Sequence, residues 1–174
     1  LILGPTSETL PHNVHTTHVQ TAQEMFTACK QALPADIAIC AAAVADWTVT
    51  GAKQKIKKEK GKVPTLTLKE NPDILKWLSS ETKQRPSLVI GFAAETEKLE
   101  ANAKAKLKRK GCDWLLANDV SGGKVFGKDK NQILFLPKGE KWHGGKAEIA
   151  TKLVAQIAKE FSSQTKKKKQ KESA

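Results

Sequence analysis

The feature that most constrains the fold of this chain is a set of short, mainly apolar segments. They lie at residues 36–44, 87–94 and 113–118. A strand that is apolar on both faces is typical of a parallel sheet covered by helices on either side. Helical patterns separate these runs, at residues 71–80 and 97–110. This alternation predicts an α/β fold, a three-layer Rossmann-like sandwich with a mainly parallel central sheet.

The first part of the chain extends this pattern. Residues 1–4 are typical of a short buried strand, and residues 15–19 of a β-branched one. Thr21 is an expected helix N-cap, with Glu24 three positions later as its capping-box partner. The helix that they begin should end near Leu33. Alternating strands and helices therefore begin at the first residues given.

The rest of the chain predicts four further features. Residues 63–69 alternate like an exposed edge strand, and Asn71 is the expected cap of a helix whose first residue is Pro72. Residues 131–144 are predicted to form a C-terminal hairpin, followed by an amphipathic helix over 146–161. A lysine-rich tail, 162–174, has nothing to bury and is expected to be disordered. One domain, 1–161, is predicted.

Length and composition limit the class of protein. A chain of 174 residues fits a single domain. It has neither an apolar run long enough for a membrane span nor the basic start of a signal peptide. Its three cysteines, an odd number in apolar or helical settings, are interpreted as small core residues in a reducing compartment. We therefore expect a cytoplasmic protein with no membrane association.

The formal net charge of +12 predicts an anionic partner. Six lysines lie between residues 53 and 62, and a second cluster follows residue 98. The first cluster has too little apolar content to pack and could close over a polyphosphate as a flap. A solvated surface is the alternative for both clusters. The sign of the charge alone does not distinguish a nucleic acid from a small polyphosphate.

Candidate ligand contacts lie where the predicted strands end, the edge at which open α/β sheets bind ligands. Asp46 follows the first apolar run, and Asn71, Pro72 and Asp73 begin a helix with free backbone N–H groups. The small residues of 41–45 and 91–94 would let a flat ring approach the backbone, with Phe92 available to cover it. Close packing of helix on sheet is the alternative explanation for these alanines.

Six blocks in this order and spacing resemble phosphopantothenoylcysteine synthetase over residues 1–161. The blocks are AAAVADW, KIKK, NPDIL, GFAAET, KLKRKGCDWLLANDV and FGKDKNQ. The resemblance is to the bacterial, CTP-dependent type, a Mg²⁺-dependent phosphopantothenate–cysteine ligase of coenzyme A biosynthesis. It implies that 4′-phosphopantothenate and CTP form an acyl-cytidylate, which the amine of cysteine converts to phosphopantothenoylcysteine. It also implies a homodimer and a flavin-dependent decarboxylase domain fused upstream.

The resemblance assigns nucleotide contacts position by position. Lys55 matches the lysine that helps to form the acyl-cytidylate and is the predicted catalytic residue. Asp46 is expected near the ribose or the metal-bound triphosphate. Phe92 matches a contact to the base. The remaining matched nucleotide contacts are Ala41, Ala42, Pro72, Asp73, Ile74, Leu75, Lys106 and Lys110. Residues 59–64 fall where the family has a mobile flap.

The chain departs from the family pattern at its start, where a first β–α unit is missing. In the family, that unit carries phosphate-binding backbone and an asparagine that serves cysteine addition. Two alternatives to an active ligase follow from this departure and from the charge. One is a nucleotide-binding fragment that is inactive alone. The other is a basic nucleic-acid-binding α/β module, although no specific nucleic-acid motif is present.

Overall fold

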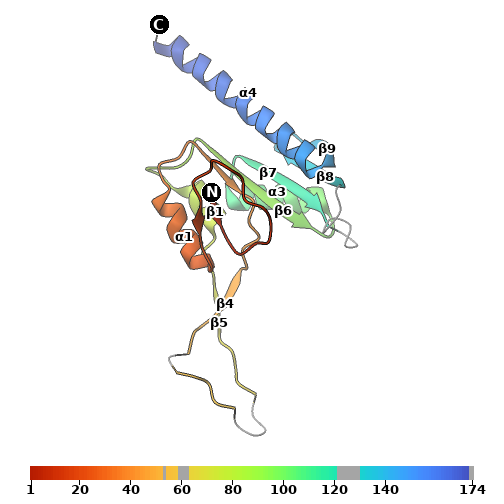
Figure 1. Ribbon diagram of the computed structural model, residues 1–174. Helices are drawn as coiled ribbons and strands as arrows, with labels where there is room; N and C mark the ends of the chain where they lie inside the picture. The colour runs from red at the N-terminus through yellow and green to blue at the C-terminus, as the bar shows by residue number, and fades with distance from the viewer. Residues whose placement is uncertain (53, 59–62, 121–129, 173–174) are drawn as a thin grey trace. The chain divides into compact units, whose positions relative to one another are not determined.

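The computed structural model describes the backbone of residues 1–52, 54–58, 63–120 and 130–172 (Figure 1). Side chains are described for these residues except at 130–131 and 163–172. The chain divides into two compact units. The first comprises Leu1–Gly91 with Arg109–Asp113, and the second comprises Phe92–Lys108 with Trp114–Ala174.

The first unit contains two pairs of parallel strands, one antiparallel hairpin and two helices. Its elements are β1 (Ile2–Leu3), β2 (Thr17–His18), α1 (Ala22–Gln31), β3 (Ile37–Cys40), β4 (Trp47–Val49), β5 (Leu68–Glu70), α2 (Ile74–Ser80) and the first half of β6 (Leu88–Glu95). β1 pairs with β2, and β3 pairs with β6 from Ile37 opposite Leu88 to Cys40 opposite Gly91. β4 and β5 pair antiparallel at the base of a long excursion of the chain (Figure 1).

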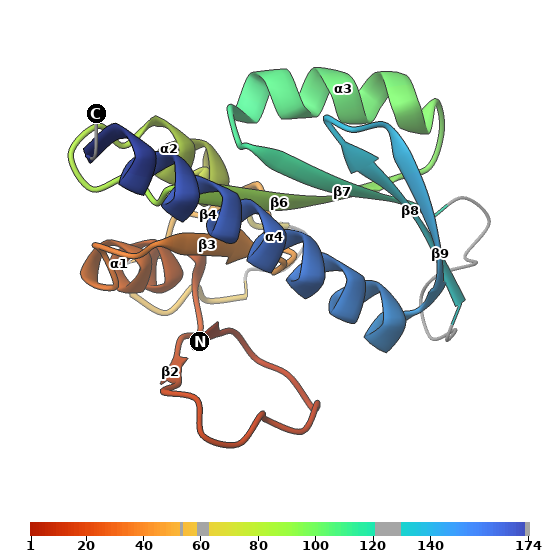
Figure 2. The ribbon, with the colours of Figure 1, turned by 90° about the horizontal axis from the view of Figure 1, so that it is seen from above.

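The second unit contains antiparallel strand pairs and two helices. Its elements are the second half of β6, α3 (Leu99–Lys110, of which the last two residues belong to the first unit), β7 (Trp114–Asp119), β8 (Lys130–Leu136), β9 (Glu140–Gly145) and α4 (Lys146–Glu172). The hydrogen-bonded order is β3-β6-β7-β8-β9, and the boundary between the units falls within β6. Within the second unit, Figure 2 shows β7, β8 and β9 as neighbouring strands. The predicted α/β, Rossmann-like fold with a C-terminal hairpin is therefore confirmed.

The core of the second unit is aromatic. β7 and β8 place Trp114 and Phe135 against each other, with ring centroids 5.2 Å apart and nearly perpendicular planes. Trp142 of β9 lies on the other side of Phe135 at 4.5 Å. α4 contacts β9 and buries one stripe of its surface, Ile149, Leu153 and Ile157, which are spaced four residues apart.

Three predicted elements are placed differently by the structure. The helix α2 begins at Ile74 with Asp73 as its N-cap, so the prediction that Asn71 caps it was wrong. Asn71 instead donates its side-chain N–H to the carbonyl oxygen of Ala45, which takes it out of the capping position. The strand expected over 36–44 ends at Cys40, and the edge strand expected over 63–69 is shortened to Leu68–Glu70.

The tail also differs from the expectation. The structure continues α4 as a helix over residues 162–172, where the sequence predicted a disordered tail. Lysine, glutamine and glutamate are good helix formers, and no proline or glycine occurs between residues 146 and 172 to end the helix. A segment can thus remain helical without an apolar face of its own.

The capping box at α1 is confirmed. The hydroxyl of Thr21 accepts the backbone N–H of Glu24 at 3.1 Å, and the Glu24 carboxylate accepts the N–H groups of Gln20 and Thr21 at 2.6 and 3.1 Å. These bonds satisfy three of the backbone donors around the helix start. They fix α1 directly after β2.

Arg85 joins three segments of the first unit. Its guanidinium donates to the carbonyl oxygens of Ser79 and Pro86. It also donates to both carboxylate oxygens of Asp113. Asp113 also accepts the backbone N–H of Val89 at 2.7 Å. This network fixes the end of α2 and the approach to β7 beside the start of β6.

We expect Arg85→Met to lower the free energy of unfolding by about 1–2 kcal/mol, because it removes these bonds while keeping the apolar stem. The side chains of Arg85 and Asp113 are 27% and 36% exposed, so solvent screening keeps the loss below that of a buried pair. Urea unfolding measures it. As a control, Lys104→Met breaks the exposed Lys104–Glu100 pair and should cost less than about 0.5 kcal/mol. Equal losses in the two variants would contradict a network role for Arg85.

Candidate functional site

The loop between β3 and β4 is tied to the segment that precedes α2. The backbone N–H of Asn71 donates to the carbonyl oxygen of Asp46 at 2.8 Å, and its side-chain amide donates to Ala45 at 2.9 Å. Asp46 immediately precedes β4, and its side chain is exposed. Asn71 therefore holds the predicted nucleotide-binding loop, residues 41–46, at the beginning of a helix. The sequence placed these two segments at one edge without indicating that Asn71 links them.

Asp73 has two partners at the start of α2. One carboxylate oxygen accepts the backbone N–H of Lys76 at 3.1 Å, and the other accepts the ammonium of Lys110 at 2.5 Å. Partial burial alone would raise the pKa of Asp73. The hydrogen bonds from Lys110 and Lys76, with the charges of both lysines, outweigh it and lower the pKa below its usual value. Asp73 is therefore ionised at neutral pH.

Lys110 reaches Asp73 because α3 ends at that point. Gly111 has a positive φ of 70°, the conformation with which glycine commonly ends a helix, and the chain then turns into the segment before β7. The side chain of Lys110 is 16% exposed, much less than a typical surface lysine. Among the predicted contacts, the structure thus brings Lys110 and Asp73 together within the first unit.

A cavity of about 470 Å³ lies in the first unit beside this edge. The loop after β1, the start of α1 and the loop after β3 form its walls. Its lining residues include Gly4, Thr6, Thr21, Met25, Ala42, Ala43, Ala45 and Asn71. Sequence analysis identified Ala42 but missed the wall that follows β1. Gly4 and Pro5 end a predicted strand, so the rule that ligands bind at strand ends would have included them.

The other predicted residues of the first unit divide into two groups. Ala41 is exposed directly after β3, and Pro72 and Leu75 are half-buried at the start of α2. The side chain of Ile74 is buried at 9% exposure as part of the core, which leaves its backbone as the group able to contact a ligand. These positions are compatible with contacts through main-chain atoms.

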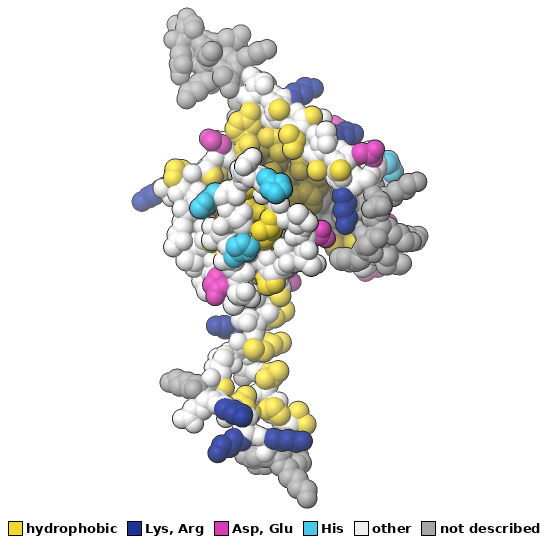
Figure 3. Space-filling view, viewed as in Figure 1, with side chains coloured by type: hydrophobic (Ala, Val, Ile, Leu, Met, Phe, Trp, Pro, Cys, Tyr) yellow, Lys and Arg dark blue, Asp and Glu magenta, His cyan; other side chains and the backbone are white. Residues whose placement is uncertain are grey.

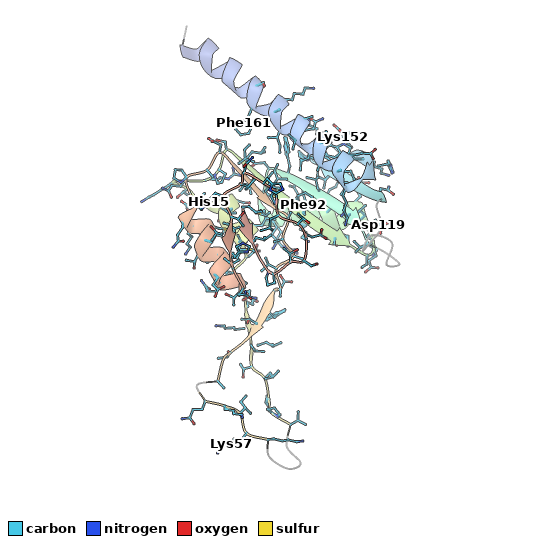
Figure 4. The ribbon with its side chains drawn as sticks, viewed as in Figure 1. His15, Lys57, Phe92, Asp119, Lys152 and Phe161 are labelled. Carbon is cyan, nitrogen blue, oxygen red and sulfur yellow. The ribbon has the colours of Figure 1, made fainter. Side chains whose placement is uncertain are left out.

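Lys55 lies on the excursion between β4 and β5 and is exposed. Within the part of the chain that the structure describes, it has no hydrogen bond or ion pair, so the structure does not join it to Asp46 or Lys110. Figure 3 shows lysines and hydrophobic side chains together on this excursion, and Figure 4 places Lys57 near its far end. Residues 59–62 of the expected flap lie outside the described residues.

Phe92 and Lys106 belong to the second unit. Phe92 is half-buried on β6, and the ammonium of Lys106 lies 3.6 Å from the carboxylate of Glu95 at the end of the same strand. The side-chain oxygen of Asn118, at the end of β7, is buried and has no hydrogen-bond partner among the described residues. This oxygen thus lacks the hydrogen bond that a buried polar atom usually has, and the sequence marked Asn118 only as the end of a strand.

No three histidine, cysteine, aspartate or glutamate side chains gather into a metal site in the described ranges. Mg²⁺ is commonly held by one or two carboxylates together with phosphate oxygens and water. Asp46, an exposed carboxylate, fits the part of a single protein ligand of that kind. The residues present are thus compatible with a metal that arrives with a polyphosphate.

The three cysteines are free thiols in the first unit. Burial, with a smaller contribution from Cys29 and Cys112, raises the pKa of Cys40 to about 12. Burial also raises the pKa of Cys29 and of Cys112. All three remain protonated at neutral pH, so none is a thiolate nucleophile. Their interpretation as packing residues agrees with this environment.

The fold and the arrangement at this edge define a Rossmann-like α/β domain with ionised groups at the carboxyl ends of its strands. The chain belongs to the family of the DNA/pantothenate metabolism flavoprotein C-terminal domain, whose family model matches residues 1–161. None of the described helices is long and apolar enough to cross a bilayer.

Curated relatives support this assignment. The coenzyme A biosynthesis bifunctional protein CoaBC of Haemophilus influenzae is 43% identical over 166 residues, covering 92% of this chain and 41% of the relative. The protein of the same name from Mycobacterium tuberculosis strain H37Rv is 36% identical over 172 residues, covering 90% and 41%. The chain therefore spans less than half the length of these relatives.

Solved structures agree with the fold. The C-terminal domain of a coenzyme A biosynthesis bifunctional protein CoaBC superposes with a TM-score of 0.69 at 30% identity, covering 93% of this chain and 74% of that one. The DNA/pantothenate metabolism flavoprotein from Streptococcus pneumoniae gives a TM-score of 0.72 at 18% identity, covering 90% and 79%, a likeness of fold alone.

Proposed function

We propose that this chain is the ligase portion of a coenzyme A biosynthesis protein, joining 4′-phosphopantothenate to cysteine through an acyl-cytidylate made from CTP. A role in coenzyme A biosynthesis is what the relatives' names support. The observation that carries the finer proposal is the pairing of Lys110 with Asp73 where Asn71 ties down the Asp46 loop. A cation and a free carboxylate thus lie at the edge where nucleotides bind in such folds.

The first step joins two anions. A carboxylate oxygen of 4′-phosphopantothenate attacks the α-phosphorus of CTP, a new O–P bond forms, and the bond to the departing pyrophosphate breaks. Mg²⁺, when bound, would neutralise triphosphate charge. Lys55 and Lys110 would stabilise charge on the phosphate oxygens, with Lys106 as a further cation. Asp46 would orient the ribose or carry the metal-bound triphosphate.

The second step forms the amide. The amine of cysteine attacks the acyl carbon, the C–O bond to the cytidylate breaks, CMP leaves, and the ammonium proton passes to solvent or a base. The small side chains of Ala41 and Ala42 would let the acyl-cytidylate approach the backbone, and Phe92 would cover the base. Pro72, Ile74 and Leu75 would offer main-chain contacts.

We further propose that a β–α unit of the longer protein completes this domain. In the described part of the chain, β3 pairs only with β6, and β1 pairs only with β2. β3 and β1 therefore each have one edge without a partner strand. Ile39 of β3 is 49% exposed, although its sequence is typical of a strand covered on both faces. A further strand would give such edges a partner.

Assembly is also a proposal. The upstream flavin-dependent decarboxylase domain is supported by the bifunctional names of the relatives. A homodimer is proposed with the β8–β9 hairpin as its surface, since β9 pairs only with β8 among the described strands.

Calorimetric titration with CTP and with ATP, both with Mg²⁺ at moderate salt, tests the nucleotide proposal. We expect CTP to bind at least about tenfold more tightly, a difference of about 1.4 kcal/mol. Equal affinity, or no binding of either nucleotide, would count against a CTP-dependent site in this chain. Tight, strongly salt-dependent binding to duplex DNA instead would favour a nucleic-acid-binding module.

A further inference from the structure

We infer that Asp73 is a positioning residue that acts on a nucleotide through Lys110. This inference rests on the proposed function, in which Lys110 contacts a phosphate. It assigns to Asp73 a task different from direct contact. One carboxylate oxygen is fixed by the backbone of α2 and the other holds the ammonium of Lys110.

Asp73 is held by its own helix and contacts a lysine from a second helix. Asp73 is fixed to its own helix because it caps the N–H of Lys76, so its second oxygen has a defined place. Lys110 comes from the last residue of α3, 37 positions away in the sequence. A contact between two separate elements, one of them pinned by a cap, is well suited to hold a long side chain in one place.

The remaining hydrogen-bond capacity of Lys110 suits a phosphate. A lysine ammonium has three N–H donors and no acceptor. The carboxylate of Asp73 takes one of them in the structure, which leaves the others for a ligand. A free lysine loses side-chain entropy when it binds, whereas one that is already held loses less.

The location also fits. Asp73 and Lys110 lie at the start of α2, next to Asn71, which lines the cavity of about 470 Å³ and bonds the main chain of Ala45 and Asp46. Asp73, which holds the ammonium, thus follows by two residues the asparagine that bonds the loop carrying the Asp46 carboxylate. All these residues belong to the first unit.

The pair differs from an ordinary surface ion pair. On the same helix, Lys104 pairs with Glu100, but these side chains are 62% and 63% exposed. Those of Lys110 and Asp73 are 16% and 39% exposed. The Lys104–Glu100 pair is therefore a matched control, an exposed pair four residues apart with no second anchor.

Removing the charge of Asp73 has two opposing effects on an anionic ligand. It takes away a negative charge, which favours the ligand, and it releases Lys110, which disfavours it. Asparagine caps helices as well as aspartate does, so Asp73→Asn keeps the start of α2. If positioning dominates, nucleotide affinity falls in this variant; if charge repulsion dominates, affinity rises. The sign of the change therefore separates the two.

The first experiment is a double-mutant cycle on the dissociation constant for CTP with Mg²⁺, using Asp73→Asn, Lys110→Gln and the double variant. We expect Asp73→Asn to weaken binding by roughly tenfold, as for a lost hydrogen bond to a charged group. In the Lys110→Gln background the same change should have little effect. Asp73→Glu should restore part of the affinity, and Glu100→Gln should leave it unchanged. Independent, additive losses, or tighter binding by Asp73→Asn, would overturn the inference.

The second experiment does not depend on CTP. Acetylation of the unliganded chain by acetic anhydride, read at each lysine by mass spectrometry, reports how free each ammonium is. Lys110 should react severalfold faster in Asp73→Asn than in the unchanged chain, while Lys104 reacts at the same rate in both. No change at Lys110 would overturn the pairing itself. If Lys110→Gln leaves CTP affinity unchanged while the acetylation result holds, the proposed function of Lys110 fails and the ion pair remains.

Discussion

Lys55→Gln should lower the rate of pyrophosphate release from CTP and 4′-phosphopantothenate at least about a hundredfold, the usual effect of removing a group that stabilises transition-state charge. Lys55 would contribute its ammonium to the phosphate only when ligands are present, since it has no hydrogen bond or ion pair among the described residues. The same absence predicts an unchanged fold. A discontinuous assay, in which the reaction is quenched at set times and pyrophosphate is quantified, measures the rate. Urea unfolding checks the fold.

Lys57→Gln is the matched control for this prediction. Lys57 lies two residues away on the same excursion and is exposed like Lys55. Its removal changes the net charge by the same amount, so a general attraction of anions would make the two variants equal. We expect Lys57→Gln to retain activity within about threefold, a loss that electrostatic steering alone can explain. Full activity in Lys55→Gln would contradict its assignment as the catalytic residue.

The fold could be predicted largely from hydrophobic patterns. The segment over 113–118 contains β7, and the hairpin predicted over 131–144 is present as β8 and β9. The hairpin loop is three residues long, and Gly139 in it has a φ of 72°, as such loops require. Local patterns predict these strands correctly because the apolar residues that favour a strand are also the residues buried in the core.

The predictions are wrong where a hydrogen bond to a residue far away in the sequence determines the local structure. Asn71 has the sequence features of a helix cap, but its bonds to Ala45 and Asp46, about 25 residues earlier, shift the cap to Asp73. The local sequence does not show which of two possible capping residues, two positions apart, bonds to a distant part of the chain. The helical tail is the opposite case, in which propensity without an apolar face was sufficient.

In the candidate site, too, the sequence indicates single residues but not the contacts between distant ones. Resemblance placed Asp46, Asp73 and Lys110 among the contacts from their positions in the matched blocks, without a reason for their proximity. The structure gives that reason for Asp73 and Lys110, which are joined by an ion pair between the ends of different helices. The cavity wall at Gly4 and Thr21 was missed because neither residue is charged or part of a matched block.

Phe135→Ala should be the most destabilising single change in the second unit. Phe135 is fully buried on β8 and contacts two other large rings, those of Trp114 and Trp142. Truncation loses the transfer free energy of the ring and leaves a cavity, a combined loss of about 3–5 kcal/mol. The two ring pairs add about 0.5–1.5 kcal/mol each beyond their burial, which favours the upper part of that range.

Domains of this size are commonly stable by about 5–15 kcal/mol, so this loss would shift the urea midpoint substantially. Tryptophan fluorescence follows the transition, because Trp114 and Trp142 lie against the deleted ring. Val154→Ala is the control: Val154 is 62% exposed on α4, and its truncation should change stability by less than about 0.5 kcal/mol. A loss below about 1.5 kcal/mol for Phe135→Ala would mean that the surrounding side chains collapse into the space, as an adaptable core does. The aromatic cluster would then not be the part that holds β7, β8 and β9 together.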